Sequence, residues 1–162
     1  MARLVLTDAS PLIGLARVDG LCWLAPLFGV VWMPLEVQRE VLTGCGAADE
    51  QAIVVAVEMG WLRVCGPTPM VPELPELDEG ESACIRIALA HETDSLLLMD
   101  ERAGRAIAME HGLRVAGTAA VIGMARLKGL LPSARVALAR LHGSDFRISA
   151  QVIEAVLRKV GE

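Results

Sequence analysis

Short apolar segments typical of strands alternate with amphipathic segments typical of helices along most of this chain. Parallel strands need a long crossover connection, and a helix usually supplies it, so this alternation predicts a parallel sheet covered by helices on both faces. We therefore expect an α/β fold with three αβα layers and a five-stranded, mostly parallel sheet. The expected strands are residues 4–7, 30–32, 61–65, 96–99 and 113–116.

The helices are expected between these strands and after the last of them. Residues 66–79 contain four prolines and several acidic residues, and we interpret them as a surface loop because neither flank holds a complete sheet. A chain of 162 residues is typical of one domain, so residues 1–162 are expected to fold together. The expected helices are residues 10–18, 34–42, 47–59, 79–91, 101–111 and 118–128, with one more after Ser133 and one after Ser149.

Composition narrows the class of protein. Apolar residues make up 54% of the chain and aromatic residues only 3%, so the core is expected to be aliphatic and some apolar surface to be left for self-association or a partner. The four cysteines form no C-x-x-C pair, which argues against a zinc knuckle or a redox motif. The longest uncharged stretch, residues 21–35, is too short and too interrupted by proline and glycine to span a membrane. We expect a cytoplasmic protein without a signal peptide.

The net charge of −5 conceals an uneven distribution. Residues 1–101 carry 5 Arg against 16 Asp and Glu, a net charge of −11, whereas residues 102–162 carry 10 Lys and Arg against 4 Asp and Glu, a net charge of +6. This asymmetry is consistent with a metal-binding carboxylate cluster beside a surface that attracts phosphate. Ordinary variation of surface charge explains it equally well.

Four carboxylates from distant parts of the chain are candidates for one site. Asp8 and Asp100 each follow a predicted strand, and right-handed crossovers place the carboxyl ends of parallel strands at one edge of the sheet. Glu81 shares a helix face with apolar residues and should point inward, which is costly unless the charge is paired or coordinated. Glu40 lies nearer the edge of the buried face of its helix than Glu36 does. Hard oxygen ligands such as these suit Mg²⁺ or Mn²⁺.

Each of these carboxylates also has a purely structural interpretation. Asp8 could form an Asx turn, although Ser10 is expected to supply the helix cap there. Asp100 is well placed as the N-cap of the helix that follows it. Asp78 and Glu81 have the spacing of a capping box. Capping does not exclude metal binding at any of these positions.

Basic and hydroxyl side chains near the same edge are candidates for binding phosphate. Arg102 and Arg105 follow Asp100 closely, although a solvated helix face explains them as well. Ser10 and Thr118, each at an expected helix start, complete the candidates for phosphate contact. The chain contains no G-x-G-x-x-G, P-loop or G-x-S-x-G motif, which argues against dinucleotide, P-loop nucleotide and serine-hydrolase sites.

An ordered set of short segments resembles the PIN-domain ribonucleases, which include the VapC-like toxins of toxin–antitoxin pairs. The opening at residues 8–13 resembles a PIN subfamily of largely uncharacterised prokaryotic proteins. The resemblance runs to about Leu131, so residues 1–131 are expected to form a PIN-like core and residues 132–162 to add C-terminal helices. The better-known toxins usually carry Asp where this chain has Glu81, and Thr or Ser where it has Leu98. The other matching segments are Pro34–Glu40, Gly80–Ala83, Leu98–Arg105 and Gly112–Thr118.

The resemblance implies metal-dependent endonucleolytic cleavage of RNA. By that implication, Asp8, Glu40, Glu81 and Asp100 would hold one or two Mg²⁺ or Mn²⁺ ions. It also implies an RNA substrate, a protein antitoxin and, together with the surplus apolar surface, a homodimer. Two alternatives stay open at this point, a non-catalytic PIN-like module that binds RNA or protein and a metal-dependent phosphohydrolase of a small substrate.

Overall fold

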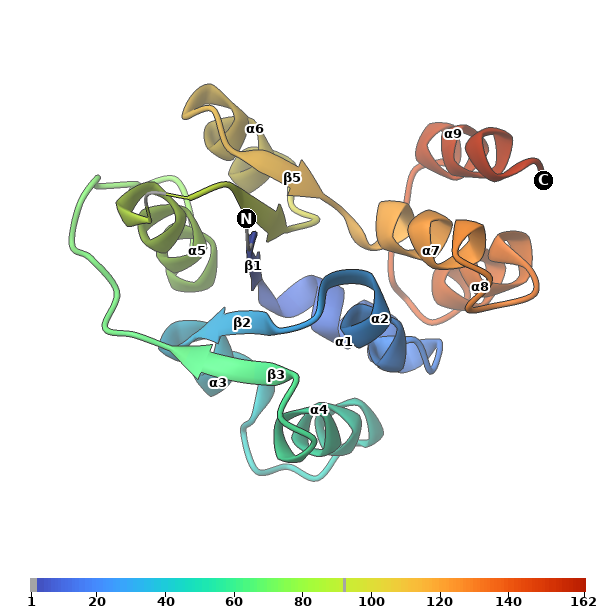
Figure 1. The fold of residues 1–162 in the computed structure, drawn as a ribbon, viewed down its shortest axis with the longest axis horizontal. Coiled ribbons are helices and arrows are strands. Elements are labelled where there is room, and N and C mark those ends of the chain that lie inside the picture. The colour runs from blue at the N-terminus through green and yellow to red at the C-terminus, as the bar shows by residue number, and fades with distance from the viewer. Residues whose placement is uncertain (1–2, 92) are drawn as a thin grey trace.

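The computed structural model describes residues 3–91 and 93–162 and shows a five-stranded sheet in which every neighbouring pair of strands is parallel. The strand order is β3-β2-β1-β4-β5. Helices flank the sheet on both faces, so the predicted αβα architecture is confirmed (Figure 1). The strands are β1 (Leu4–Thr7), β2 (Val31–Pro34), β3 (Leu62–Cys65), β4 (Ser95–Leu98) and β5 (Arg114–Ala116).

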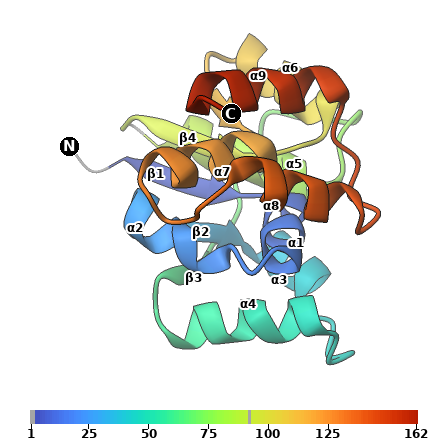
Figure 2. The same ribbon diagram turned by 90° about the vertical axis from the view of Figure 1, so that its right-hand side faces the viewer.

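The helices divide between the two faces of the sheet. α5 contacts β1, β2 and β4 and lies beside α6, whereas α1 packs beside α4 and α7 (Figures 1 and 2). Right-handed crossovers explain this division. The chain runs from β1 to β2 and β3 on one side of the sheet, and then crosses to β4 and β5 on the other side, so the connecting helices lie on opposite faces. The helices are α1 (Ala9–Arg17), η1 (Leu21–Trp23, a 3₁₀ turn), α2 (Leu24–Phe28), α3 (Leu35–Val41), α4 (Ala48–Glu58), α5 (Glu79–Ala90), α6 (Arg102–Glu110), α7 (Thr118–Leu127), α8 (Ala134–His142) and α9 (Ala150–Val160).

Apart from Thr7 and Ser95 at their ends, β1 and β4 are apolar, because helices cover both of their faces. All residues of β4 are buried, and so are Val5, Leu6 and Thr7 of β1. This explains why the strands appear in the sequence as short continuous apolar runs without alternation. The expected boundaries of the strands and of the main helices agree with the structure to within about two residues.

One helical region was not expected from the sequence. Residues 21–28 form η1 and α2, although the uncharged stretch that contains them carried no clear helical signal. In the described part of the chain no single helix is long and apolar enough to span a membrane, but α1 and the segment 21–28 together pass the same test as a pair bent by 113°.

The last two helices are fixed to the rest of the fold by specific contacts. Helices follow Ser133 and Ser149 as predicted, and the side chains of these serines cap α8 and α9. The Glu162 carboxylate also caps α8, because it accepts hydrogen bonds from the Ser133 hydroxyl at 2.7 Å and the Ala134 N–H at 2.7 Å. α9 packs closely on α7, where a Cβ on Gly123 would lie 3.0 Å from Val156 (Figure 2).

The connectivity creates a switch point between β1 and β4. The chain continues from β1 to β2 on one side and from β4 to β5 on the other, and ligands of open α/β sheets bind beyond the carboxyl ends of the strands at such a point. The Asp8 N–H donates to the Leu98 carbonyl at 2.9 Å, so the two strands stay in register up to this edge. Asp8 and Asp100 therefore leave neighbouring strands at the switch point.

Candidate functional site

Asp8 is a buried carboxylate with one unsatisfied oxygen. Its side chain is 3% exposed, and within the described residues its Oδ1 atom has no hydrogen-bond partner. The pKa of Asp8 is raised from 3.8 to about 7, mainly by burial and also by the neighbouring charges of Asp78, Glu81 and Glu40, although the Ala9 backbone N–H lowers it. An unpaired polar oxygen in such a place points to a ligand that the structure does not contain.

The predicted cap of α1 was wrong. Asp8, rather than Ser10, occupies the N-cap position, and its side chain makes no capping hydrogen bond. Ser10 lies inside the first turn of the helix and is half-buried. The Asp8 carboxylate is therefore free for another role, because it makes no capping hydrogen bond itself.

Asp8 and Glu40 approach each other at Gly80, in the first turn of α5. A Cβ on Gly80 would lie 2.8 Å from Asp8 Oδ1 and 3.5 Å from Glu40 Oε2. Glu40 is exposed on α3, and partial burial together with the charge of Asp78 raises its pKa. The glycine thus leaves room for a carboxylate that follows β1 and a carboxylate of α3 to approach each other at the start of α5.

Glu81 forms the predicted capping box with Asp78. Asp78 Oδ1 accepts a hydrogen bond from the Glu81 N–H at 2.8 Å, and Glu81 Oε2 accepts one from the Asp78 N–H at 3.2 Å. Glu81 is 5% exposed, as its inward position predicted, and burial raises its pKa. Its other oxygen, Oε1, lies 2.9 Å from where a Cβ on Gly104 of α6 would be. Capping therefore occupies one oxygen of Glu81 and leaves the other facing α6.

Asp100 is held by Thr118 rather than by the helix that follows it. Asp100 Oδ1 accepts from the Thr118 N–H at 2.8 Å, and Asp100 Oδ2 accepts from the Thr118 hydroxyl at 2.7 Å. The N-cap position of α6 belongs to Glu101, so the interpretation of Asp100 as the cap of that helix was wrong, whereas α7 begins at Thr118 as expected. Burial raises the pKa of Asp100, whereas the two Thr118 hydrogen bonds lower it.

The residues predicted to contact phosphate occupy different environments. Arg102 is exposed on the first turn of α6. Arg105 is half-buried, donates from Nη1 to the Met99 carbonyl at 3.0 Å, and its charge lowers the pKa of Asp100. The Thr118 hydroxyl is fully buried, so in this conformation it cannot reach a phosphate and instead positions Asp100.

The charges divide the candidate site into two parts. Asp8, Glu40 and Glu81 are close enough for the charge of Asp78 to raise the pKa of each of them. Asp100 responds instead to Arg105 and Glu101. None of the ion pairs in residues 3–91 and 93–162 involves any of these carboxylates. The sequence interpretation missed Asp78 as a member of the acidic group, because its capping role accounted for it.

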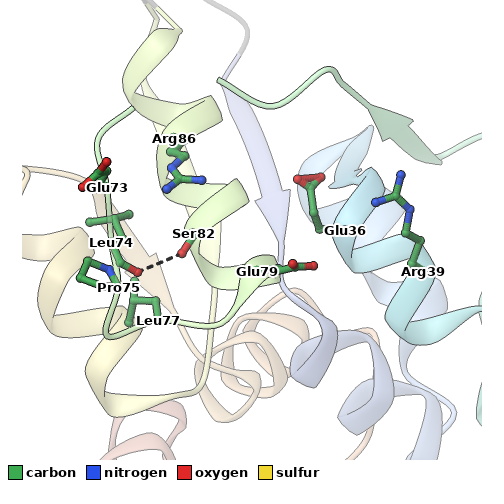
Figure 3. A pocket seen from close by; sticks show the side chains of 9 residues that line it. All are labelled: Glu36, Arg39, Glu73, Leu74, Pro75, Leu77, Glu79, Ser82 and Arg86. Atoms are coloured by element: carbon green, nitrogen blue, oxygen red, sulfur yellow. Dashed lines mark hydrogen bonds between the residues drawn. The ribbon is translucent and has the colours of Figure 1, made fainter. Parts of the chain in front are cut away.

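A polar cleft of about 540 Å³ opens beside the acidic group, between α3 and α5. Figure 3 shows Glu79 extending from the start of α5 toward α3, and the hydrogen bond from the Ser82 hydroxyl to the Leu74 carbonyl, 3.5 Å long, along the loop side. Glu79 and Ser82 flank Gly80 and Glu81 in the chain, so the cleft adjoins the first turn of α5, but Asp8, Glu40, Glu81 and Asp100 do not line it. It is lined by Glu36, Arg39, Glu73, Leu74, Pro75, Leu77, Glu79, Ser82 and Arg86.

The donor atoms fit a hard divalent cation in their chemistry. All are carboxylate oxygens, which Mg²⁺ and Mn²⁺ prefer, and Asp8 Oδ1 is an oxygen that needs a partner. In the described part of the chain, however, no three acidic, histidine or cysteine side chains converge closely enough to hold one ion. Simultaneous coordination would therefore require rotation of flexible side chains such as exposed Glu40.

Comparison with known proteins adds a family to this geometry. A family model described as a PIN domain matches residues 4–162. The match includes α8 and α9, which lie beyond Leu131, where the similarity of individual motifs ends. No curated protein and no solved structure matches the chain.

Proposed function

The chain belongs to the PIN-domain family, whose members are generally nucleases, and on that basis we propose that it is a metal-dependent endoribonuclease. The observation that carries the proposal is the unpaired, buried Oδ1 atom of Asp8 at the switch point of the sheet. The neighbouring carboxylates would otherwise repel one another without compensation.

Asp8, Glu40, Glu81 and Asp100 are the proposed ligands of one or two Mg²⁺ or Mn²⁺ ions. Such an ion, when bound, lowers the pKa of a water molecule so that hydroxide is available near neutral pH. Asp8 supplies the oxygen that lacks a partner, Glu40 the mobile side chain, and Glu81 the oxygen that its capping role leaves unused. Thr118 keeps the carboxylate of Asp100 in a fixed orientation.

Substrate binding is proposed to involve phosphate contacts without base readout. Arg102 is exposed at the start of α6, two residues after Asp100, and can contact a phosphate directly. Arg105 is tied to the Met99 carbonyl, so its charge acts at a fixed place beside Asp100. Ser10, half-buried near Asp8, remains a proposed phosphate contact.

The decisive experiment compares cleavage of a structured RNA by the wild type and by Asp8→Asn at saturating Mn²⁺. Asp8→Asn should abolish cleavage and keep the circular dichroism spectrum of the wild type. Glu58→Gln serves as the matched control, because it removes the same charge from an exposed position at the end of α4. Full activity of Asp8→Asn would remove Asp8 from the chemistry.

The same assay separates the proposal from its alternatives. A wild type that binds RNA but leaves it intact would be a non-catalytic module. A wild type that hydrolyses a chromogenic phosphodiester but no RNA would be a phosphohydrolase of small substrates.

The motifs of this chain resemble those of VapC-like toxins, and on that resemblance we propose that it is the toxin of a toxin–antitoxin pair. A cytoplasmic location is proposed on the same resemblance. A small open reading frame overlapping the start of the gene, encoding a protein that inhibits cleavage, would support the toxin role.

Self-association is proposed on a different observation, an apolar groove of about 400 Å³ between η1, α2 and α4. Val55 and Met59 at its rim are 52% and 72% exposed. Light scattering should show a homodimer for the wild type and a monomer for Met59→Lys. Met70→Lys, changed at an exposed loop methionine outside the groove, should stay dimeric. A monomeric wild type would contradict the proposal.

A further inference from the structure

We infer that Asp78 belongs to the cation site as an additional carboxylate, beside Asp8 and Glu40 at the start of α5. The inference deepens the proposed function and rests on it, because it concerns the same divalent ion. Asp78 would thus combine two roles, capping α5 with one oxygen and facing the cation with the other.

The geometry of the first turn of α5 places Asp78 next to the other carboxylates. Its Oδ1 atom accepts the Glu81 N–H at 2.8 Å, which fixes the carboxylate against the start of the helix. Two residues further on, Gly80 lies against both Asp8 Oδ1 and Glu40 Oε2. Asp78 is exposed, so its Oδ2 atom is accessible from solvent. The first turn of α5 therefore lies beside carboxylates from three segments of the chain, and in the described residues they need side-chain rotation before three of them can hold one ion.

A second observation is a buried oxygen at the same place that needs a partner. Asp8 Oδ1 is aimed at the same turn of α5, and Asp8 is only 3% exposed. This oxygen has no hydrogen-bond partner within the described residues. A cation at the start of α5 would satisfy it.

The distribution of charge distinguishes Asp78 from other acidic residues nearby. Its negative charge acts on Asp8, Glu40 and Glu81 alike. Exposed Glu101 acts on Glu81 and Asp100 only, among these carboxylates. Since no ion pair in the described ranges involves Asp78, the repulsion at this turn is left for a cation to relieve.

The test exploits the fact that asparagine caps a helix about as well as aspartate. Asp78→Asn keeps an oxygen that can accept the Glu81 N–H but removes the charge and weakens the oxygen as a metal ligand. Asp78→Ala removes both the cap and the charge. Glu58→Gln again controls for the loss of one acidic charge. Binding of Mn²⁺ to the full chain would be measured by titration calorimetry and by electron paramagnetic resonance of the free ion.

The expected result is a Mn²⁺ affinity at least about tenfold weaker in Asp78→Asn, with an unchanged Tm in chelator. Asp78→Ala should lose the same affinity and also have a lower Tm. An affinity of Asp78→Asn within twofold of the wild type would overturn the inference.

The result is also separable from the proposed function. A wild type that binds Mn²⁺ and loses it in Asp78→Asn, yet cleaves no RNA, would contradict the nuclease proposal and support the role of Asp78. A wild type that binds no Mn²⁺ would overturn both.

Discussion

Thr118 binds both carboxylate oxygens of Asp100, one through its backbone N–H at 2.8 Å and the other through its hydroxyl at 2.7 Å. These two bonds join the segment that follows β4 to the start of α7, the helix that follows β5. Because Thr118 is fully buried, water does not compete for the hydroxyl. The orientation of Asp100 is therefore set by a residue 18 positions away in the chain.

Thr118→Val should release Asp100 while keeping the shape of the side chain. One oxygen of Asp100 would lose its hydrogen bond, which should lower the free energy of unfolding by about 1–3 kcal/mol. Cleavage and Mn²⁺ affinity should also fall. Denaturant unfolding and calorimetry of Thr118→Val against Thr118→Ser check this, since serine retains the hydroxyl. Equal losses in the two variants would show that the hydroxyl is not what positions Asp100.

The raised pKa of Asp8 predicts a pH-dependent stability. The pKa of this carboxyl rises from an ordinary 3.8, as in the unfolded chain, to about 7 in the folded chain, so between these values the folded chain keeps a proton that the unfolded chain releases. The free energy of unfolding of the metal-free protein should thus decrease as the pH rises from about 4 to 7, by about 4 kcal/mol from Asp8. Urea unfolding in chelator checks this. Asp8→Asn should flatten the decline, and an equally steep decline in that variant would contradict the assignment.

Cation affinity should have the opposite pH dependence, because Asp8 must lose its proton to bind a metal. Below pH 7 the affinity for Mn²⁺ should rise by up to about tenfold per pH unit, and above pH 7 it should level off. Calorimetric titrations at a series of pH values measure this, with the heats in buffers of different ionisation enthalpy reporting the proton released. An affinity independent of pH between about 5 and 8 would mean that Asp8 does not bind the ion.

Gly80→Ala should damage the site more than the fold. The new Cβ would lie 2.8 Å from Asp8 Oδ1, a distance too short for an ordinary contact, so the Asp8 carboxylate would have to move. We expect a loss of about 1–3 kcal/mol in stability and a clear loss of Mn²⁺ affinity. Gly143→Ala is the matched control, because its nearest contact would be an ordinary 3.5 Å. Unchanged Mn²⁺ affinity in Gly80→Ala would place the cation elsewhere.

Local sequence signals predicted those parts of the protein in which neighbouring residues determine the structure. The apolar run of residues 4–7 became β1 with the same ends. The spacing of Asp78 and Glu81 predicted their capping box, and the helices expected after Ser133 and Ser149 are α8 and α9. In each case the interacting groups are close neighbours along the chain, so composition and spacing suffice.

Predictions failed where the partner of a residue lies far away in the chain. Capping of the helix that follows was one interpretation of Asp100, but its carboxylate binds Thr118. One error was local: Ser10 was expected to cap α1, but Asp8, two residues earlier, occupies that position. A capping preference describes what a residue does beside its neighbours, and it gives no weight to a distant group that competes for the same side chain.

The order of residues along the chain was enough to specify the alternation of strands and helices, and with it the edge at which Asp8 and Asp100 emerge. Three features of the site needed the packed fold: the unpaired oxygen of Asp8, the approach of Asp8 and Glu40 to Gly80, and the two hydrogen bonds from Thr118 to Asp100. Strand and helix formation depend on periodicity along the chain, which can be read from the residues in order. The partners of a buried carboxylate depend instead on how distant segments pack around it.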